Sequence, residues 1–155
     1  MAGTVEQRLT EMGVKLPKPA APAANYIPFV TTGKIVFVSG QLTILNGKLM
    51  YLGKVGDTLS TDDGYKAAQI CAINLIAQVK EACFGDLDRV LQVVKLGGFV
   101  NCTPDFTDQP KVINGASDLI AKAFGESGKH SRFAVGASSL PLGVAVEVDG
   151  VFEIS

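Results

Sequence analysis

Apolar residues recur at helical spacing in two long stretches of the chain. Between residues 60 and 84 they fall on one face of a 3.6-residue period. The segment "STDD" at 60–63 supplies an N-cap and first-turn acids, and Gly85 is a stop signal. We therefore predict a helix over 60–84. Its buried stripe is formed by Ala68, Ala72, Leu75, Ile76, Val79 and Cys83.

A second helix is predicted over 109–124, with Asp108 as its cap. A shorter one is predicted over 4–12, with Thr4 as its cap and Gly13 at its end. A Pro/Ala-rich stretch then indicates an extended connector rather than a domain boundary. The inward face of the second helix consists of Ile113, Ala116, Ile120 and Phe124.

The next part of the chain has the β-branched and aromatic runs that are typical of strands. Strands are expected over 26–32 and 34–40, and Pro28 places the first of them at a sheet edge or a bulge. Asn46-Gly47 between apolar runs predicts a tight hairpin turn.

Three further strands are expected, over 90–102, 132–137 and 143–154. Gly97-Gly98 in the first of them marks either a bulge or a close backbone approach. After the leader, the order is β-β-β-α-β-α-β-β. It predicts one α+β domain with a mixed sheet and its helices on one face. The other sheet face would be exposed in a monomer, so we expect a homo-oligomer.

Composition limits the classes of function. The chain has 155 residues with a net charge of −1, which argues against nucleic-acid binding through phosphate neutralisation. Its three cysteines do not form a disulfide or zinc pattern, and it has one histidine. We see neither a secretory signal nor an apolar run long enough for a membrane. The expected location is the cytoplasm.

Candidate chemistry gathers in "HSRFAVGASSLPLGVAVEVDG" at 130–150. Arg132 could hold a carboxylate in its planar fork, or be a surface arginine paired with an acid. His130 could be a general base or a hydrogen-bonding loop residue, and spacing reveals no nucleophile beside it. Glu147 and Asp149 share a strand face, where a carboxylate could position water or simply face solvent.

Four segments together resemble the YjgF/RidA reactive-intermediate deaminase family. They are "YIPFVTTGKIVFVSGQL", with its Tyr 13 residues before Ser-Gly-Gln; "VVKLGGFVNCTPDF"; "VINGAS"; and the pattern R-x-A-V-x4-L-P-x4-V-E-V that runs from Arg132 to Val148. The resemblance covers the chain from about residue 20, leaving residues 1–19 as an N-terminal extension that carries the short helix.

The resemblance implies a chorismate-mutase-like fold assembled as a homotrimer, with ligand clefts between subunits. It also implies hydrolysis of enamine or imine intermediates, such as 2-aminoacrylate, to 2-keto acids and ammonia, with no metal or organic cofactor. By position, Arg132 matches the arginine that holds the substrate carboxylate, and Glu147 the glutamate near the attacking water. Tyr26 and Asn114 match residues that line the cleft, and the main-chain N–H near Ala134 would help to orient the substrate.

Departures from the family pattern indicate a divergent branch. Ala134 stands where many members have Cys, Ala24-Asn25 where Gly-Pro is usual, and Leu-Thr follows Gln41 in place of Ile-Pro. Two other functions stay open. One is a non-catalytic trimer that binds a small carboxylate for regulation. The other is RNA cleavage or translation inhibition, attributed to some relatives, which the net charge and single histidine disfavour.

Overall fold

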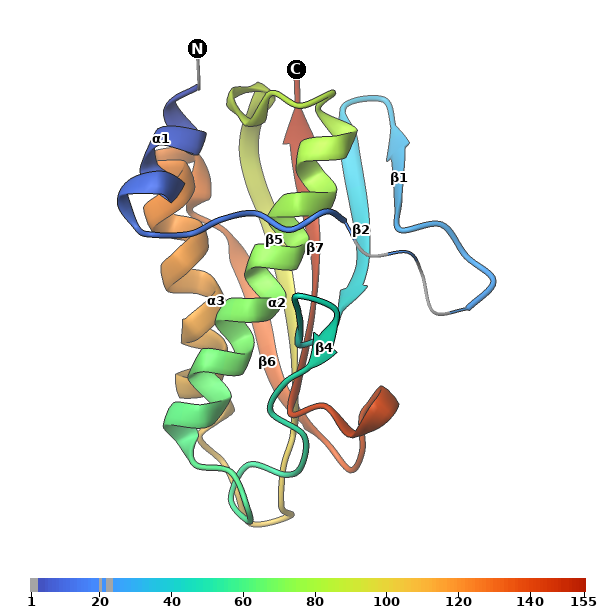
Figure 1. Cartoon of the computed structure of the whole chain (residues 1–155), viewed down its shortest axis with the longest axis vertical. Helices are drawn as coiled ribbons and strands as arrows, with labels where there is room; N and C mark the ends of the chain where they lie inside the picture. Colours follow the sequence, from blue (N-terminus) through green and yellow to red (C-terminus); the bar gives the residue numbers. More distant parts are fainter. Residues whose placement is uncertain (1–2, 20, 22–23) are drawn as a thin grey trace.

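The structure is a computed structural model that describes residues 3–19, 21 and 24–155. A mixed five-stranded sheet forms its centre (Figure 1). The strands β5 and β6 are parallel and the other pairs antiparallel. Their order is β1 (Phe29–Thr32), β2 (Ile35–Gln41), β7 (Val146–Ile154), β5 (Val90–Asn101) and β6 (Ser131–Ala137). The α+β prediction with a mixed sheet is confirmed.

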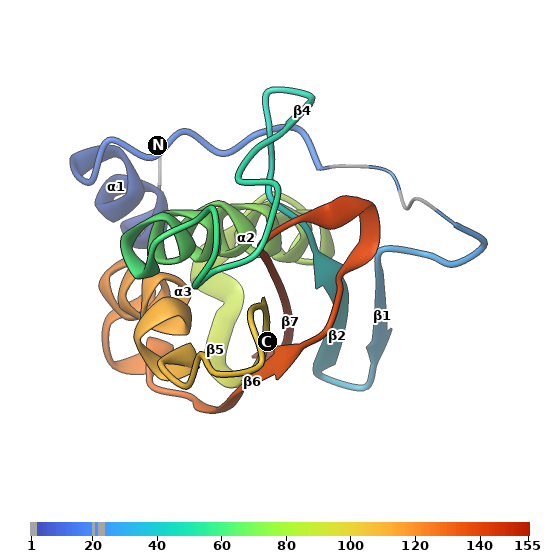
Figure 2. The ribbon, with the colours of Figure 1, turned by 90° about the horizontal axis from the view of Figure 1, so that it is seen from below.

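Two long helices, α2 (Thr61–Ala82) and α3 (Gln109–Phe124), cover one face of this sheet (Figure 2). The N-cap predicted from "STDD" is present and is part of a capping box. Ser60 Oγ accepts from the Asp63 N–H at 3.1 Å, and the Asp63 carboxylate accepts from the Ser60 N–H at 2.9 Å. The predicted inward stripes of both helices are buried against the sheet, since 3.6-residue spacing keeps them on one side.

Smaller elements complete the chain. The helix α1 (Thr4–Glu11) packs against α3, and the hairpin of β3 (Ile44–Leu45) and β4 (Lys48–Leu49) turns at Asn46-Gly47 as predicted. Both turn residues have positive φ, which this tight turn requires. Short 3₁₀ turns are η1 (Leu87–Arg89), η2 (Gly125–Gly128) and η3 (Pro141–Gly143).

The start of α1 differs from the prediction. Its N-cap is Gly3, not Thr4, and the N–H groups of Thr4 and Val5 donate to the Asp88 carboxylate at 2.8 and 3.0 Å. These two hydrogen bonds are the largest causes of the lowered pKa of Asp88. The helix is therefore capped from η1, by a residue 84 positions away in the chain.

Two strand boundaries also need correction. The first strand begins at Phe29 rather than residue 26, and the last at Val146 rather than residue 143. At Gly97-Gly98 the close approach, rather than the bulge, is confirmed, because the register shifts of β5 lie before Lys95. A Cβ on Gly98 would lie 2.6 Å from Ile113 of α3. The predicted connector at 17–24 lies partly outside the described residues.

Within the part of the chain that the structure describes, no helix covers the second face of the sheet, which we call the open face. Alternation along the strands places Phe37 and Val135 there, with 49% and 43% of their surface exposed. Phe99 and Phe133 meet edge to face on it, with ring centroids 5.2 Å apart. The open face therefore exposes a group of aromatic and aliphatic side chains.

Candidate functional site

Arg132 lies on β6, the edge strand, and points to the helix side of the sheet. Its Nη1 donates to Ser117 Oγ at 3.0 Å, and its Nη2 donates to the Pro110 carbonyl oxygen at 3.1 Å. Both acceptors belong to α3 and both are neutral. Among the residues that the structure describes, no carboxylate forms an ion pair with Arg132. The guanidinium is thus held between a strand and a helix with its charge uncompensated.

Asn114 belongs to the same stripe of α3. It is one helical turn from Pro110 and nearly one turn from Ser117, so the three residues share the helix face beside β6. Asn114 is exposed. The fold therefore places Arg132 on β6 and Asn114 on the neighbouring face of α3. Ala134 lies two residues further along β6, on the same strand face as Arg132.

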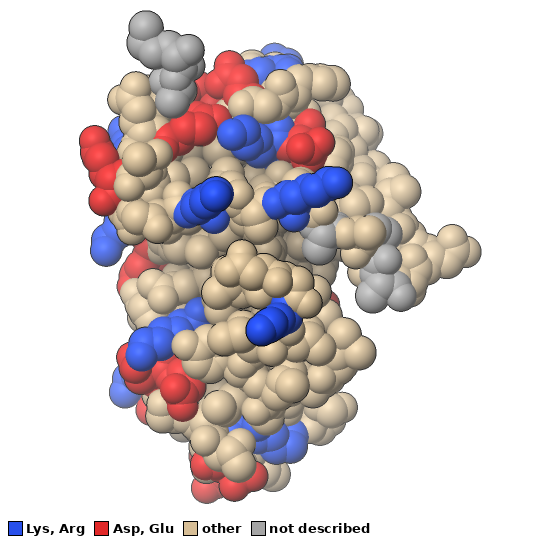
Figure 3. All heavy atoms as spheres, viewed as in Figure 1, with Lys and Arg blue, Asp and Glu red and all other residues tan. Residues whose placement is uncertain are grey.

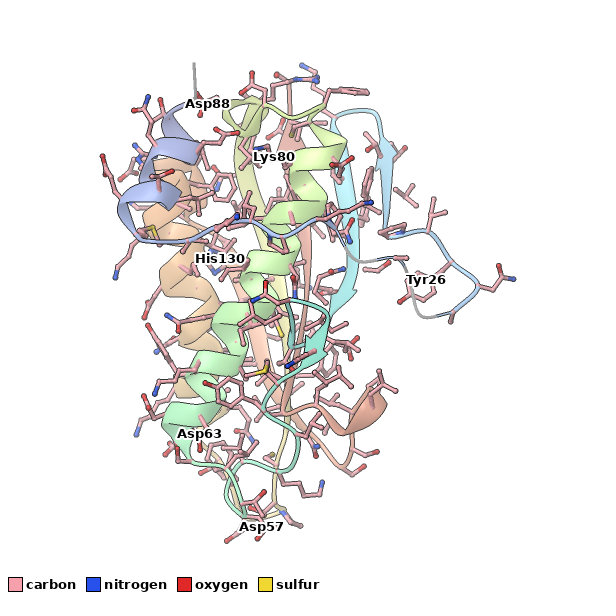
Figure 4. The ribbon with its side chains drawn as sticks, in the orientation of Figure 1. Tyr26, Asp57, Asp63, Lys80, Asp88 and His130 are labelled. Carbon is pink, nitrogen blue, oxygen red and sulfur yellow. The ribbon has the colours of Figure 1, made fainter. Side chains whose placement is uncertain are left out.

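His130 has a partner that spacing in the sequence did not reveal. Its Nε2 lies 2.8 Å from Ser117 Oγ, and its Nδ1 lies 2.7 Å from the Gly128 carbonyl oxygen. Figure 4 marks His130 beside α3. The serine was part of the quoted motif "VINGAS", but 13 residues separate it from His130 and only the packing of α3 on β6 joins them.

Glu147 lies on β7 and faces the opposite side of the sheet. It pairs in register with Phe99, and its carboxylate lies directly against the backbone of Gly40. A side chain at position 40 would require the Glu147 carboxylate to move, so Gly40 leaves room for the carboxylate in this position. Burial raises the pKa of Glu147 above its usual value, and the neighbouring charge of Asp149 adds to the effect.

One chain does not bring all the expected site residues together. Arg132 faces the helices, whereas Glu147 faces the open side, because paired residues share a face and successive residues alternate. Tyr26 is 46% exposed in the loop before β1, at the other edge of the five-stranded sheet from β6 (Figure 4). Residues from both edges could meet only between two copies of the chain.

Within the described residues, no three His, Cys, Asp or Glu side chains gather closely enough to hold a metal ion. The three cysteines are buried, and burial raises the pKa of the Cys71 thiol far above its ordinary range. In the same part of the chain, no helix combines the length and the apolar character that a membrane span needs.

A family model described as "YjgF/chorismate_mutase-like, putative endoribonuclease" matches residues 6–152. The chain belongs to this family. The matched range takes in most of α1 as well as the sheet and both long helices. The resemblance inferred from the sequence motifs, and the YjgF-like chorismate-mutase-like fold that it implied, are both confirmed.

Individual relatives agree with this assignment. Protein TCP17 of Trypanosoma cruzi is 47% identical over 155 residues, which cover 99% of this chain and 96% of TCP17. The crystal structure of Atu1372 from Agrobacterium tumefaciens, a protein of unknown function, is 46% identical and superposes with a TM-score of 0.93, covering 98% of this chain and 93% of that one. RidA from an Antarctic Psychrobacter shares the fold at 23% identity and a TM-score of 0.60, covering 88% and 94%.

Proposed function

We propose that this protein hydrolyses small enamine or imine intermediates that carry a carboxylate, such as 2-aminoacrylate, to 2-keto acids and ammonia. The observation that carries the proposal is the guanidinium of Arg132. It is half-buried, it is fixed by two neutral acceptors on α3, and it has no carboxylate counter-ion among the described residues. Such a group favours an anionic ligand, and a carboxylate matches its planar fork.

Once the carboxylate is bound, hydrolysis of the imine needs few further contributions from the site. An imine carbon is already electrophilic, so the site must fix the substrate, hold a water against the C=N bond and move protons. Arg132 holds the carboxylate, with Asn114 on the neighbouring face of α3. The main-chain N–H near Ala134 orients the substrate. None of these steps needs a metal or an organic cofactor.

The remaining residues of the proposed site come from a second copy. Glu147 lies on the open face, and Tyr26 lies at the sheet edge far from β6. Both residues can therefore join Arg132 only where two copies of the chain meet. We therefore place the ligand clefts between the subunits of a homotrimer, which also covers the apolar open face. Glu147 would lie near the attacking water in that cleft, where its carboxylate can accept a hydrogen bond from the water and orient it.

The direct test is the decay of 2-aminoacrylate generated in situ by a serine dehydratase. Wild-type protein should accelerate the decay, and Arg132→Ala should lose roughly 30- to 150-fold of the rate, the equivalent of about 2–3 kcal/mol for a charge-assisted bidentate contact. Arg132→Lys should recover only part, because an ammonium lacks the fork. Arg89→Ala, which removes an arginine that stacks on Phe84, is the matched control and should keep full activity.

Two other results would contradict the proposal. Protein that is inert towards imines, yet binds 2-oxobutyrate through Arg132, would be a non-catalytic carboxylate sensor. Protein that is inert and also does not bind the keto acid would show that Arg132 forms no carboxylate site. In both cases the wild-type rate equals the rate without protein.

The family description also names endoribonuclease activity, which makes RNA cleavage the second candidate. The face shown in Figure 3 intersperses basic with acidic side chains, and the chain has a net charge of −1. Phosphate recognition favours a concentration of positive charge. Salt-dependent RNA binding together with cleavage that survives Arg132→Ala would favour this second function.

A further inference from the structure

Ser117, His130 and Arg132 form a continuous hydrogen-bonded chain. Ser117 comes from the middle of α3, His130 from the segment between η2 and β6, and Arg132 from β6. The serine oxygen lies 2.8 Å from His130 Nε2 and 3.0 Å from Arg132 Nη1. A hydroxyl therefore sits between a base and a permanent cation. We call the first two residues the Ser117–His130 pair.

The direction of each hydrogen bond follows from the Gly128 carbonyl group, where the hydrogen-bonded series ends. The Gly128 carbonyl oxygen can only accept, so His130 Nδ1 carries a proton and donates to it across 2.7 Å. In the neutral imidazole, Nε2 is then an acceptor, and the Ser117 hydroxyl donates to it. The guanidinium can only donate, so Ser117 Oγ accepts from Arg132. The donor and the acceptor of each of these hydrogen bonds are thus assigned.

This arrangement prepares the serine hydroxyl to exchange its proton. A base with its second nitrogen fixed by an acceptor, placed against a hydroxyl, is the geometry by which hydroxyl groups are activated. The guanidinium on the other side stabilises negative charge that develops on the oxygen. A purely structural tie between β6 and α3 would need only the bond from Arg132 to Ser117, and would not need an oriented imidazole.

The position of the pair matters for the proposed hydrolysis, on which this inference rests. Ser117 Oγ is hydrogen-bonded to the group that would hold the substrate carboxylate, whereas Glu147 of the same chain faces the other side of the sheet. The reacting C=N bond is next to the carboxylate in a 2-imino acid. Direct contact, or contact through one water, is the reach that proton transfer needs.

Imine hydrolysis requires a proton to move from oxygen to nitrogen twice. First the water oxygen bonds to the imine carbon, the π pair moves to nitrogen, and a water proton must reach that nitrogen. Then the C–N bond breaks with its electron pair on nitrogen, and the proton of the new hydroxyl must reach nitrogen so that ammonia leaves and C=O forms. Both atoms are bonded to the same carbon, which makes direct transfer strained.

We propose that the Ser117–His130 pair carries this proton. Ser117 Oγ accepts the proton from the oxygen while its own proton moves to His130 Nε2. The imidazolium then returns that proton through Ser117 to the nitrogen, and both residues regain their starting state. The sum of the two steps is imine plus water to 2-keto acid plus ammonia. Ser117 meets the reacting groups, and His130 acts through it.

The test compares Ser117→Ala, Ser117→Thr and His130→Gln with wild type on 2-aminoacrylate and on 2-oxobutyrate binding. We expect Ser117→Ala and His130→Gln to lower kcat by about 100-fold or more, with KM and keto-acid affinity changed by less than about threefold. Ser117→Thr, which keeps a hydroxyl, should restore most of kcat. Ser131→Ala is the matched control, since Ser131 is exposed and donates to the Val94 carbonyl instead.

A spectroscopic measurement tests the geometry without any turnover. His130 is the chain's only histidine, so nitrogen NMR of the imidazole gives one pair of signals. These signals should show that the neutral form of the ring carries its proton on Nδ1. A proton on Nε2 instead would overturn the inference. So would full activity of Ser117→Ala and His130→Gln in the presence of an active wild type. An inert wild type would overturn the proposed function and this inference together.

Discussion

At the scale of single residues, Glu147 has a side chain whose charge lowers the stability of the fold. Its carboxylate is half-buried on the open face, next to Asp149 and against the backbone of Gly40. Burial and the like charge both raise its pKa, so the folded protein holds the Glu147 proton more tightly than the unfolded chain does. By linkage, the free energy of unfolding falls as the pH rises from the ordinary carboxyl pKa to the raised one. At neutral pH the ionised carboxylate is therefore a net cost to the fold.

Glu147→Gln should make the fold more stable at neutral pH and lower the proposed hydrolase activity. The amide has no charge to desolvate, so the urea midpoint at about pH 7 should rise above that of wild type, and the difference should shrink towards about pH 4. Imine hydrolysis should fall in the same variant. Glu153→Gln changes a carboxylate on the same strand face and serves as the control, with stability within about 0.5 kcal/mol of wild type. A variant that is destabilised at neutral pH would contradict this account of Glu147.

Among the elements, the packing of α3 on α2 decides where the candidate-site residues of α3 lie. Gly115 is buried at this contact, and a Cβ there would overlap the backbone carbonyl oxygen of Tyr65. The helix that carries Asn114 and Ser117 can approach α2 only because position 115 has no side chain. Backbone cannot yield as a side chain can, so this contact fixes the distance between the helices.

Gly115→Ala should destabilise the protein by about 1–3 kcal/mol through overpacking, measured as a shift in the urea midpoint. Gly64→Ala is a close control, because Gly64 is a buried helical glycine in the same interface. A Cβ there would lie 3.0 Å from the methyl groups of Val112, which can shift slightly. Both substitutions gain the same helix propensity, so the difference between them isolates the backbone clash. Equal stability of the two variants would show that the helices are free to move apart.

Periodicity was sufficient to locate α2 and α3, because each keeps an uninterrupted apolar stripe. It could not locate the contacts between distant elements. The cap of α1 comes from Asp88, and the partner of His130 from the middle of α3. The alternation of β6 and β7 was visible in the sequence, but the register that sets Arg132 and Glu147 on opposite faces depends on β5 between them. The family motifs indicated which residues to expect in the proposed site. The pairing of the strands decides which of these residues one chain can bring together.

At the scale of the whole molecule, the sheet separates the proposed site into two halves. Arg132 lies on the edge strand β6, and Tyr26 precedes the opposite edge strand β1. Residues 13–19 run across α2 towards the β1 edge (Figure 1). Within this segment, Val14 and Leu16 pack on the core. In a ring of three copies, the β6 edge of one subunit can face the β1 side of the next, which joins the two halves and covers the open face.

The most direct test of this account is complementation between two inactive variants. Arg132→Ala and Tyr26→Ala proteins are each purified, shown by sedimentation to be trimers, then unfolded together and refolded as a mixture. If every cleft takes its arginine from one subunit and its tyrosine from a neighbour, an equal mixture should regain about a quarter of the wild-type rate of 2-aminoacrylate hydrolysis. Mixed trimers that form, as seen by mass spectrometry, and stay inactive would show that the cleft is not shared between subunits in this way.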